Sequence, residues 1–121
     1  MSLKTYVSLP HISVSSTGKA HSEVDTFLAK KGFNRRVSLV IPHYTLAVRV
    51  ALDSDVILTL PYNLAVRLPE RDQFHFLPLP VPFGDFNYSM IWHPRSQDDA
   101  GHRWLREALF SVGEKVEKIA T

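Results

Sequence analysis

The chain has 121 residues, of which 45% are hydrophobic and 21% are charged, as is typical of one folded domain rather than of a disordered chain. Its formal net charge is +2 and its lysines and arginines are scattered, so it has no basic stripe of the kind that binds nucleic acid. The lack of cysteine excludes disulfides, thiolate nucleophiles and cysteine zinc sites. No apolar run reaches the roughly 18 residues that a membrane span needs, and we expect a cytoplasmic domain.

The first third of the chain predicts a strand, a helix and a second strand. Residues 1–10 are expected to be a lead-in, and the opening "MSLK" resembles residues added for expression. His11–Ser16 alternates polar and β-branched residues, as strands do. In the segment "GKAHSEVDTFLAKKG", Ser22 and Asp25 resemble a capping pair at the start of a helix, and a glycine follows where the helix should stop. Arg35–Pro42 predicts a strand whose continuous apolar end indicates burial on both faces.

The middle of the chain repeats this alternation. The segment "HYTLAVRVALDSD" predicts a helix whose inner face contains Leu46, Ala47 and Val50. Val56–Pro61 predicts a third buried strand, and "YNLAVRLPERDQ" predicts a short helix that Pro69 ends. Strands that alternate with helices in this way indicate an α/β domain with a mostly parallel sheet flanked by helices.

The rhythm changes in the last third of the chain. The segment "FHFLPLPVPFGDF" begins as a strand, and Pro78–Pro82 then limits it to an edge or an extended crossing segment. Tyr88–His93 predicts a final strand, and Asp98 or Asp99 then caps a long helix. The predicted inner face of that helix consists of Trp104, Leu105, Ala108, Leu109, Val112 and Val116.

The polar residues of the stretch "WHPRSQDDAGH" raise the question of a metal site. His93, His102, Asp98 and Asp99 are possible ligands, but the nine-residue gap between the histidines spans a turn instead of one helix face. A polar turn with a helix cap explains these residues better. No sequence template for catalysis is present, and a hydrolase built on His43 and Asp53 would lack a nucleophile. We therefore expect no enzyme, no metal and no cofactor.

The sequence itself indicates candidate binding residues at two corners where a strand leads into a helix. "IPHYT" follows the second strand and "TLPYN" follows the third. The side chains of His43, Tyr44, Thr45 and Asn63 would therefore stand where strands end and helices begin. Ligands of open α/β sheets bind at this edge, beside helix N-termini. The alternative is that Pro42 and Pro61 only end strands and that His43 and Asn63 only cap helices. From the residues alone both interpretations stand.

An ordered set of segments resembles a known family. The segments "HSEVDTFLAKKGFNRRVSLVIPHYTLA", "SDVILTLPYNLA", "LPLPVP" and "WHPRSQDDAGHRWLRE" resemble, over roughly residues 5–112, the effector-binding domain of LysR-type transcriptional regulators. The ending is typical of the subgroup that responds to aromatic compounds and flavonoids. The resemblance implies a fold like that of type II periplasmic binding proteins, in which two α/β subdomains joined by crossing strands hold an inducer between them.

The resemblance also implies a division of this chain and a set of site residues. Residues 11–84 would be the second subdomain, and residues 85–121 would be the return strand and helix of an incomplete first subdomain. The chain would then be a C-terminal fragment of a longer regulator. The effector-binding positions that the resemblance implies are His11, Pro42, His43, Tyr44, Pro61, Phe83 and Phe86.

Partners follow from the same resemblance. It implies a small-molecule effector, aromatic by preference, and a homo-oligomer that is a dimer or tetramer in the parent protein. DNA would be bound only through a winged helix-turn-helix that precedes this chain, and no membrane would be involved. The alternative function is a stand-alone small-molecule binding module without a DNA-binding partner domain, and the parent reading frame would distinguish the two.

Overall fold

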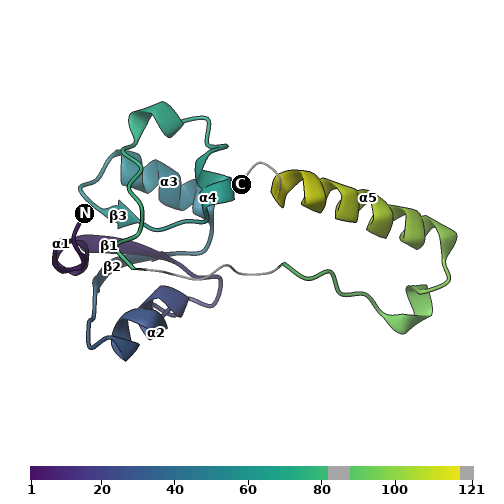
Figure 1. Ribbon diagram of the computed structural model, residues 1–121, viewed down its shortest axis with the longest axis horizontal. Coiled ribbons are helices and arrows are strands. Elements are labelled where there is room, and N and C mark those ends of the chain that lie inside the picture. The colour runs from purple at the N-terminus through teal and green to yellow at the C-terminus, as the bar shows by residue number, and fades with distance from the viewer. Residues whose placement is uncertain (82–87, 118–121) are drawn as a thin grey trace.

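The computed structural model describes residues 1–81 and 88–117 (Figure 1). Its helices and strands, in chain order, are α1 (Leu3–Ser8), β1 (Pro10–Val14), α2 (Glu23–Lys30), β2 (Arg36–Ile41), α3 (Tyr44–Leu52), β3 (Ile57–Leu58), α4 (Tyr62–Ala65) and α5 (Ala100–Glu117). Two short 3-10 helices lie at Arg71–Gln73 and Pro94–Ser96. Among the described residues, no helix is long and apolar enough to cross a membrane.

The strands form a parallel three-stranded sheet in the order β2-β1-β3. Parallel neighbours require a crossover, and α2 and α3 provide the two crossovers after β1 and β2. The predicted α/β class and parallel sheet are confirmed. Because all three strands run in the same direction, their carboxyl ends lie at one edge of the sheet.

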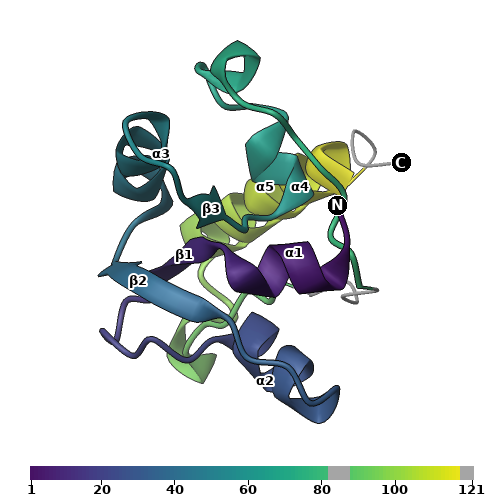
Figure 2. The same ribbon diagram turned by 90° about the vertical axis from the view of Figure 1, so that its left-hand side faces the viewer.

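Helices cover both faces of the sheet, with α3 and α4 on one side and α2 on the other (Figures 1 and 2). The core on the α3 side joins Ile12, Ile41 and Ala47. Side chains alternate along a strand, so His11 and Ser13 of β1 point to the opposite face, where both are almost completely buried. Of the predicted inner face of α3, Ala47 is buried and Val50 packs against the core, but Leu46 is 51% exposed and Val48 is buried in its place. That prediction for Leu46 was wrong by one or two positions around the helix.

The start and end of α2 follow the predicted signals. The Ser22 backbone N–H donates to Asp25 Oδ2 at 2.7 Å, which closes a capping box at the N-terminus. Gly32 follows the helix with a φ of +75°, a left-handed conformation that favours glycine. Arg35 then donates from Nε to Asp25 Oδ1 at 2.7 Å and ties the start of β2 to the start of α2.

The N-terminal segment was predicted as a lead-in but forms α1. The Ser2 hydroxyl caps it by accepting a hydrogen bond from the Thr5 backbone N–H at 3.1 Å. Tyr6 is only 2% exposed, and its hydroxyl hydrogen-bonds with Thr59 Oγ1 at 2.7 Å. Tyr6 therefore anchors this segment to the core.

Strand β2 and the chain after β3 differ from the predictions. Leu39 and Val40 of β2 are 43% and 36% exposed, because β2 is an edge strand and is not covered on both faces. Residues 74–77 and Tyr88–His93 form no strand, although both were predicted to begin or form one. A strand needs a partner for its backbone hydrogen bonds, and within the described residues these segments pair with none.

Helix α5 forms as predicted but stands away from the sheet (Figure 1). Trp104, Leu105, Leu109 and Val112 of its predicted inner face are 69%, 46%, 51% and 55% exposed. The expected packing of this face onto a core is therefore not seen among the described residues.

Candidate functional site

A pocket lies at the carboxyl edge of the sheet. It is lined by the end of β1 (Val14, Ser16), by the corner between β2 and α3 (Pro42, His43, Tyr44, Thr45) and by Leu64 of α4. Its volume is about 560 Å³, and it opens to solvent. The topology places it there because β1 and β2 end side by side, with Val14 paired to Ile41. This is the location at which parallel α/β sheets bind ligands.

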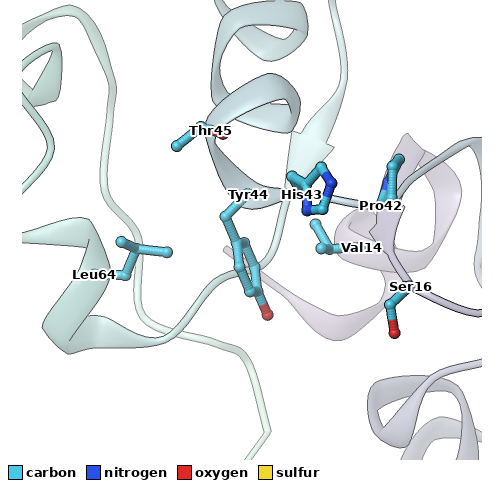
Figure 3. A pocket seen from close by; sticks show the side chains of 7 residues that line it. All are labelled: Val14, Ser16, Pro42, His43, Tyr44, Thr45 and Leu64. Atoms are coloured by element: carbon cyan, nitrogen blue, oxygen red, sulfur yellow. The ribbon is translucent and has the colours of Figure 1, made fainter.

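Figure 3 shows how the corner presents its side chains. Tyr44 lies between Leu64 on one side and His43 and Val14 on the other, and its hydroxyl points away from the helix. Pro42 and His43 are exposed, and Tyr44 is half-buried. An imidazole, a phenol and the hydroxyls of Ser16 and Thr45 thus surround an apolar floor. Such a set can hydrogen-bond the polar group of a small ligand while the apolar residues contact its ring.

The capping alternative fails at the side chains themselves. His43 occupies the N-cap position of α3, but its side chain makes no capping hydrogen bond. Asn63 is not the N-cap of α4, because Pro61 holds that position. The buried Asn63 Oδ1 has no hydrogen-bond partner within the described residues. Neither side chain caps the start of a helix, so capping does not account for the presence of these residues.

Tyr44 is the residue of the corner whose ionisation the fold changes. Burial raises the pKa of its phenol, and the nearby Tyr88 and Glu23 raise it further. Tyr44 therefore remains a neutral phenol at physiological pH, able both to donate and to accept a hydrogen bond. Tyr88 belongs to the segment that leads to α5, so this segment comes near the corner.

His11 lies elsewhere. Its side chain is fully buried, its Nε2 donates to the Tyr6 carbonyl oxygen at 2.8 Å, and its ring stands edge-on to the Tyr6 ring at 4.5 Å. Burial lowers its pKa, the Tyr6 carbonyl opposes that shift, and the charge of Arg35 adds to it. His11 is thus a neutral residue under α1 that has no surface to offer a ligand in this structure.

The remaining implied positions are not brought to the pocket by the described structure. Pro61 is half-buried at the start of α4, and Leu64 reaches the pocket in its place. Phe83 and Phe86 lie outside the described residues. The implied set thus converges only at Pro42, His43 and Tyr44.

Three lining residues were missed from the sequence, namely Val14, Ser16 and Leu64. Thr45 was predicted together with His43 and Tyr44 as part of the corner, and it lines the pocket. Val14 and Ser16 could have been found from the rule that parallel strands end at one edge. Leu64 has no signal in the sequence, because only the position of α4 over the corner brings it there.

The stretch around Trp92 is a turn and a helix cap, as predicted. Asp99 Oδ1 accepts a hydrogen bond from the His102 backbone N–H at 2.6 Å, and His93 Nδ1 accepts one from the Arg95 backbone N–H. Arg106 donates to the carbonyl oxygens of Ser96 and Gln97 at 3.0 Å, and its guanidinium lies 4.8 Å from the Trp92 ring. Within residues 1–81 and 88–117, no cluster of three or more metal-ligating side chains is present.

Comparison with known proteins links this geometry to one family. The family model described as the LysR substrate binding domain matches residues 1–113. The transcriptional activators NagR of a Ralstonia species and NahR of Pseudomonas putida are 34% and 30% identical to this chain over 112 residues. Nodulation protein D 1 of Rhizobium meliloti is 29% identical over 118 residues. NagR and NahR are by name transcriptional activators and not enzymes.

The matches cover 93% to 97% of this chain but only 37% to 38% of these curated relatives. The chain therefore spans little more than a third of their length. A crystal structure from Vibrio parahaemolyticus, described as that of a transcriptional regulator, is 30% identical with a TM-score of 0.75 over 98% of this chain and 55% of that chain. A second, from Pseudomonas aeruginosa, is 26% identical with a TM-score of 0.63 and covers 69% of this chain and 28% of the other.

Proposed function

Because this chain belongs to the LysR substrate-binding domain family, we propose that its pocket at the β2–α3 corner binds the small-molecule effector of a transcriptional regulator. The observation that carries the proposal is the convergence of His43 and Tyr44 at the carboxyl edge of a parallel sheet, with side chains that cap nothing. A chain of this kind senses a ligand and performs no catalysis. The alternative of a stand-alone binding module uses the same pocket.

The effector class that fits this pocket is a small aromatic compound with a weakly acidic group. Val14, Pro42 and Leu64 provide an apolar surface of the size of a single ring, and the Tyr44 ring can stack against the ring of an aromatic ligand. His43 and the hydroxyls of Ser16 and Thr45 can hydrogen-bond a phenol or a carboxylate. The full volume of about 560 Å³ is typical of sites for small ligands.

The division of the chain and its partners belong to the same proposal. Residues 11–84 form one lobe of a two-lobed effector domain, and residues 85–121 return to the other lobe. Such a domain works in the cytoplasm and within an oligomer, and it reaches DNA only through a winged helix-turn-helix that another part of the regulator supplies. The net charge of +2 agrees with this, because it offers little attraction to phosphates.

Titration of the isotope-labelled chain with benzoate, phenol and cyclohexanecarboxylate, followed by NMR, tests the proposed function. Benzoate should shift the backbone amide signals of His43, Tyr44 and Leu64, and cyclohexanecarboxylate should shift them less. His43→Ala should weaken benzoate binding by about tenfold, the loss of one hydrogen bond to a charged group. His75→Ala, a change at an exposed histidine away from the pocket, serves as the matched control.

The outcome that contradicts the proposal is defined by place. Shifts centred on His21 and Asn34, which line a second cavity of about 260 Å³, would move the site to that cavity beside α2. No shift with any probe at several millimolar would remove the ligand site from this chain. In a full-length regulator, His43→Ala should abolish the response to inducer while DNA affinity stays unchanged.

A further inference from the structure

The Leu64 side of the pocket is carried by a short element whose position depends on its anchors. Leu64 lines the pocket from α4, which has only four residues. A helix of one turn has little stability by itself, so the contacts that hold it determine where it lies. Ala65, which is 5% exposed, provides one such contact. The backbone N–H groups of Leu64 and Ala65 both donate to the Pro61 carbonyl oxygen at 3.0 Å, so the position of α4 follows that of Pro61.

The strand that leads to α4 ends before it reaches this helix. β3 has only two residues, Ile57–Leu58, which pair with β1, and residues 59–61 form no strand. A side-chain hydrogen bond holds this connection: the Thr59 hydroxyl bonds with the Tyr6 hydroxyl at 2.7 Å, across 53 residues of sequence. Tyr6 of α1 thus anchors the chain just before Pro61 starts α4.

Tyr6 can act as an anchor because it is itself fixed to the sheet. Its side chain is buried, and His11 Nε2 donates to its carbonyl oxygen at 2.8 Å. The rings of Tyr6 and His11 also stand edge-on, with their centroids 4.5 Å apart. His11 is fully buried and belongs to β1, the central strand of the sheet. Through Tyr6, the central strand is therefore connected to the chain that positions α4.

A shift of α4 would change the shape of the pocket more than its polar groups. Leu64 lies on the opposite side of the Tyr44 ring from His43 (Figure 3). The polar groups come from other elements, namely Ser16 after β1 and His43 and Thr45 at the β2–α3 corner. Dispersion contacts weaken steeply with distance, so the space between Leu64 and Tyr44 favours a flat aromatic ring over a thicker saturated ring only while Leu64 is held close.

We propose that Tyr6 and Thr59 are positioning residues of the effector pocket, whose hydrogen bond holds α4 so that Leu64 selects flat aromatic rings. Neither of the two side chains lines the pocket, so they act through α4 and not on the ligand. The proposal rests on the proposed function, because it names the residues that set the ring selectivity of that same pocket. It gives α1 a part in ligand selection in addition to its part in the core.

Removal of either hydroxyl tests the pair by NMR titration. Tyr6→Phe keeps the ring against His11, and Thr59→Val keeps the branched shape of the side chain. Each change should weaken benzoate binding by about threefold to fivefold, the range expected for the loss of one neutral hydrogen bond. Binding of cyclohexanecarboxylate should change by less than about twofold, because a thicker ring loses less contact when Leu64 moves away. The ratio of the two affinities should therefore fall by about twofold or more.

Three further variants separate positioning from a general loss of stability. Thr59→Ser keeps the hydroxyl and should retain the affinity ratio of the unmodified chain. Tyr62→Phe removes the hydroxyl of a 65% exposed tyrosine on α4 itself and should also leave the ratio unchanged. Tyr6→Phe combined with Thr59→Val should lower the ratio no further than either change alone, because both remove the same bond. A lower folded fraction weakens the binding of both ligands by the same factor and leaves their ratio unchanged.

Hydrogen exchange of the ligand-free chain tests the position of α4 without a ligand. The Ala65 backbone N–H is bonded to the Pro61 carbonyl oxygen, and it should exchange faster by about threefold or more in Tyr6→Phe and in Thr59→Val. The Ala47 backbone N–H, which donates to the His43 carbonyl oxygen at 3.0 Å in α3, should keep its exchange rate. Faster exchange at Ala65 alone therefore indicates a local release of α4.

Any one of four results overturns the proposal. The first is an unchanged affinity ratio in Tyr6→Phe and Thr59→Val, and the second is unchanged exchange at Ala65. The third is an equal loss of the ratio in Thr59→Ser or Tyr62→Phe. The fourth is faster exchange at Ala47 together with Ala65, which indicates general destabilisation. An absence of benzoate binding to the unmodified chain would instead refute the proposed function and the selectivity with it, and exchange at Ala65 would still decide whether the pair holds α4.

Discussion

Replacing Asp25 by asparagine should destabilise this protein, because it leaves the Arg35 guanidinium buried without its partner. The two side chains are 2% (Arg35) and 13% (Asp25) exposed, and the Arg35 Nε donates to Asp25 Oδ1 at 2.7 Å. Arg35 Nη2 also donates to Asp25 Oδ2 and to the Ser22 hydroxyl, both at 3.0 Å. Asparagine keeps the size and one acceptor of the side chain but loses the charge and the second acceptor.

The size of the effect follows from the pKa of Asp25. Burial alone raises this pKa, but the hydrogen bonds from Arg35 and Ser22 and the charge of Arg35 outweigh burial and lower it from 3.8 to about 2. A shift of this size corresponds to about 2 kcal/mol of folding free energy. Removing one partner of a buried pair also leaves the other charge uncompensated, so the total loss should be about 3–5 kcal/mol.

The pH dependence of the difference identifies its cause. Because the folded-state pKa of Asp25 is depressed, the stabilisation is complete above the unfolded-state pKa of about 4 and is lost as the pH falls toward 2. The difference in unfolding free energy between the wild type and Asp25→Asn should therefore be constant from pH 5 to 7 and should shrink toward pH 2.

Urea unfolding followed by circular dichroism at several pH values measures this difference. Asp72→Asn is the matched control, because the Asp72 side chain is 97% exposed and lies 3.9 Å from an exposed Arg71. That change should cost less than about 0.5 kcal/mol at every pH. A loss below about 1 kcal/mol for Asp25→Asn at pH 6, or a loss that does not change at low pH, would refute the reasoning.

Two further predictions concern single backbone and side-chain positions. Gly32→Ala should lower the unfolding free energy by about 1 kcal/mol, because no atom lies within 4 Å of an added Cβ but the φ of +75° is strained for alanine. Gly113→Ala in α5 should instead raise the helix content measured by circular dichroism. An unchanged or higher unfolding free energy for Gly32→Ala, or a lower helix content for Gly113→Ala, would contradict this. Arg106→Ala should increase the quenching of tryptophan fluorescence by acrylamide, because the Trp92 ring becomes more exposed. The change removes the guanidinium 4.8 Å from that ring and its hydrogen bonds to the Ser96 and Gln97 carbonyl oxygens. Arg103→Ala, at an exposed arginine of the same helix, should leave the quenching unchanged.

The elements whose signals are local could be predicted from the sequence. The capping pair of Ser22 and Asp25, the glycine after α2 and the Asp99 cap of α5 are contacts between residues that are close in the chain. The parallel sheet followed from the alternation of strands and helices, since parallel neighbours require crossovers. Pro42, His43 and Tyr44 were predicted as one corner for the same reason, because they follow a strand directly. The family resemblance is confirmed by the match over residues 1–113.

What the tertiary structure alone decided depends on partners that are distant in the sequence. His11 and Ser13 share the strand pattern of Ile12, yet only the docking of α1 determined that His11 meets Tyr6 and not the pocket. Leu64 lines the pocket because α4 lies over the corner, 20 residues after Tyr44 in the chain. Tyr88–His93 has the residue pattern of a strand but forms none, because within the described chain it pairs with neither edge strand of the sheet, β2 or β3. A residue pattern specifies which face of an element is apolar, and only the presence of a second surface determines whether that face is buried.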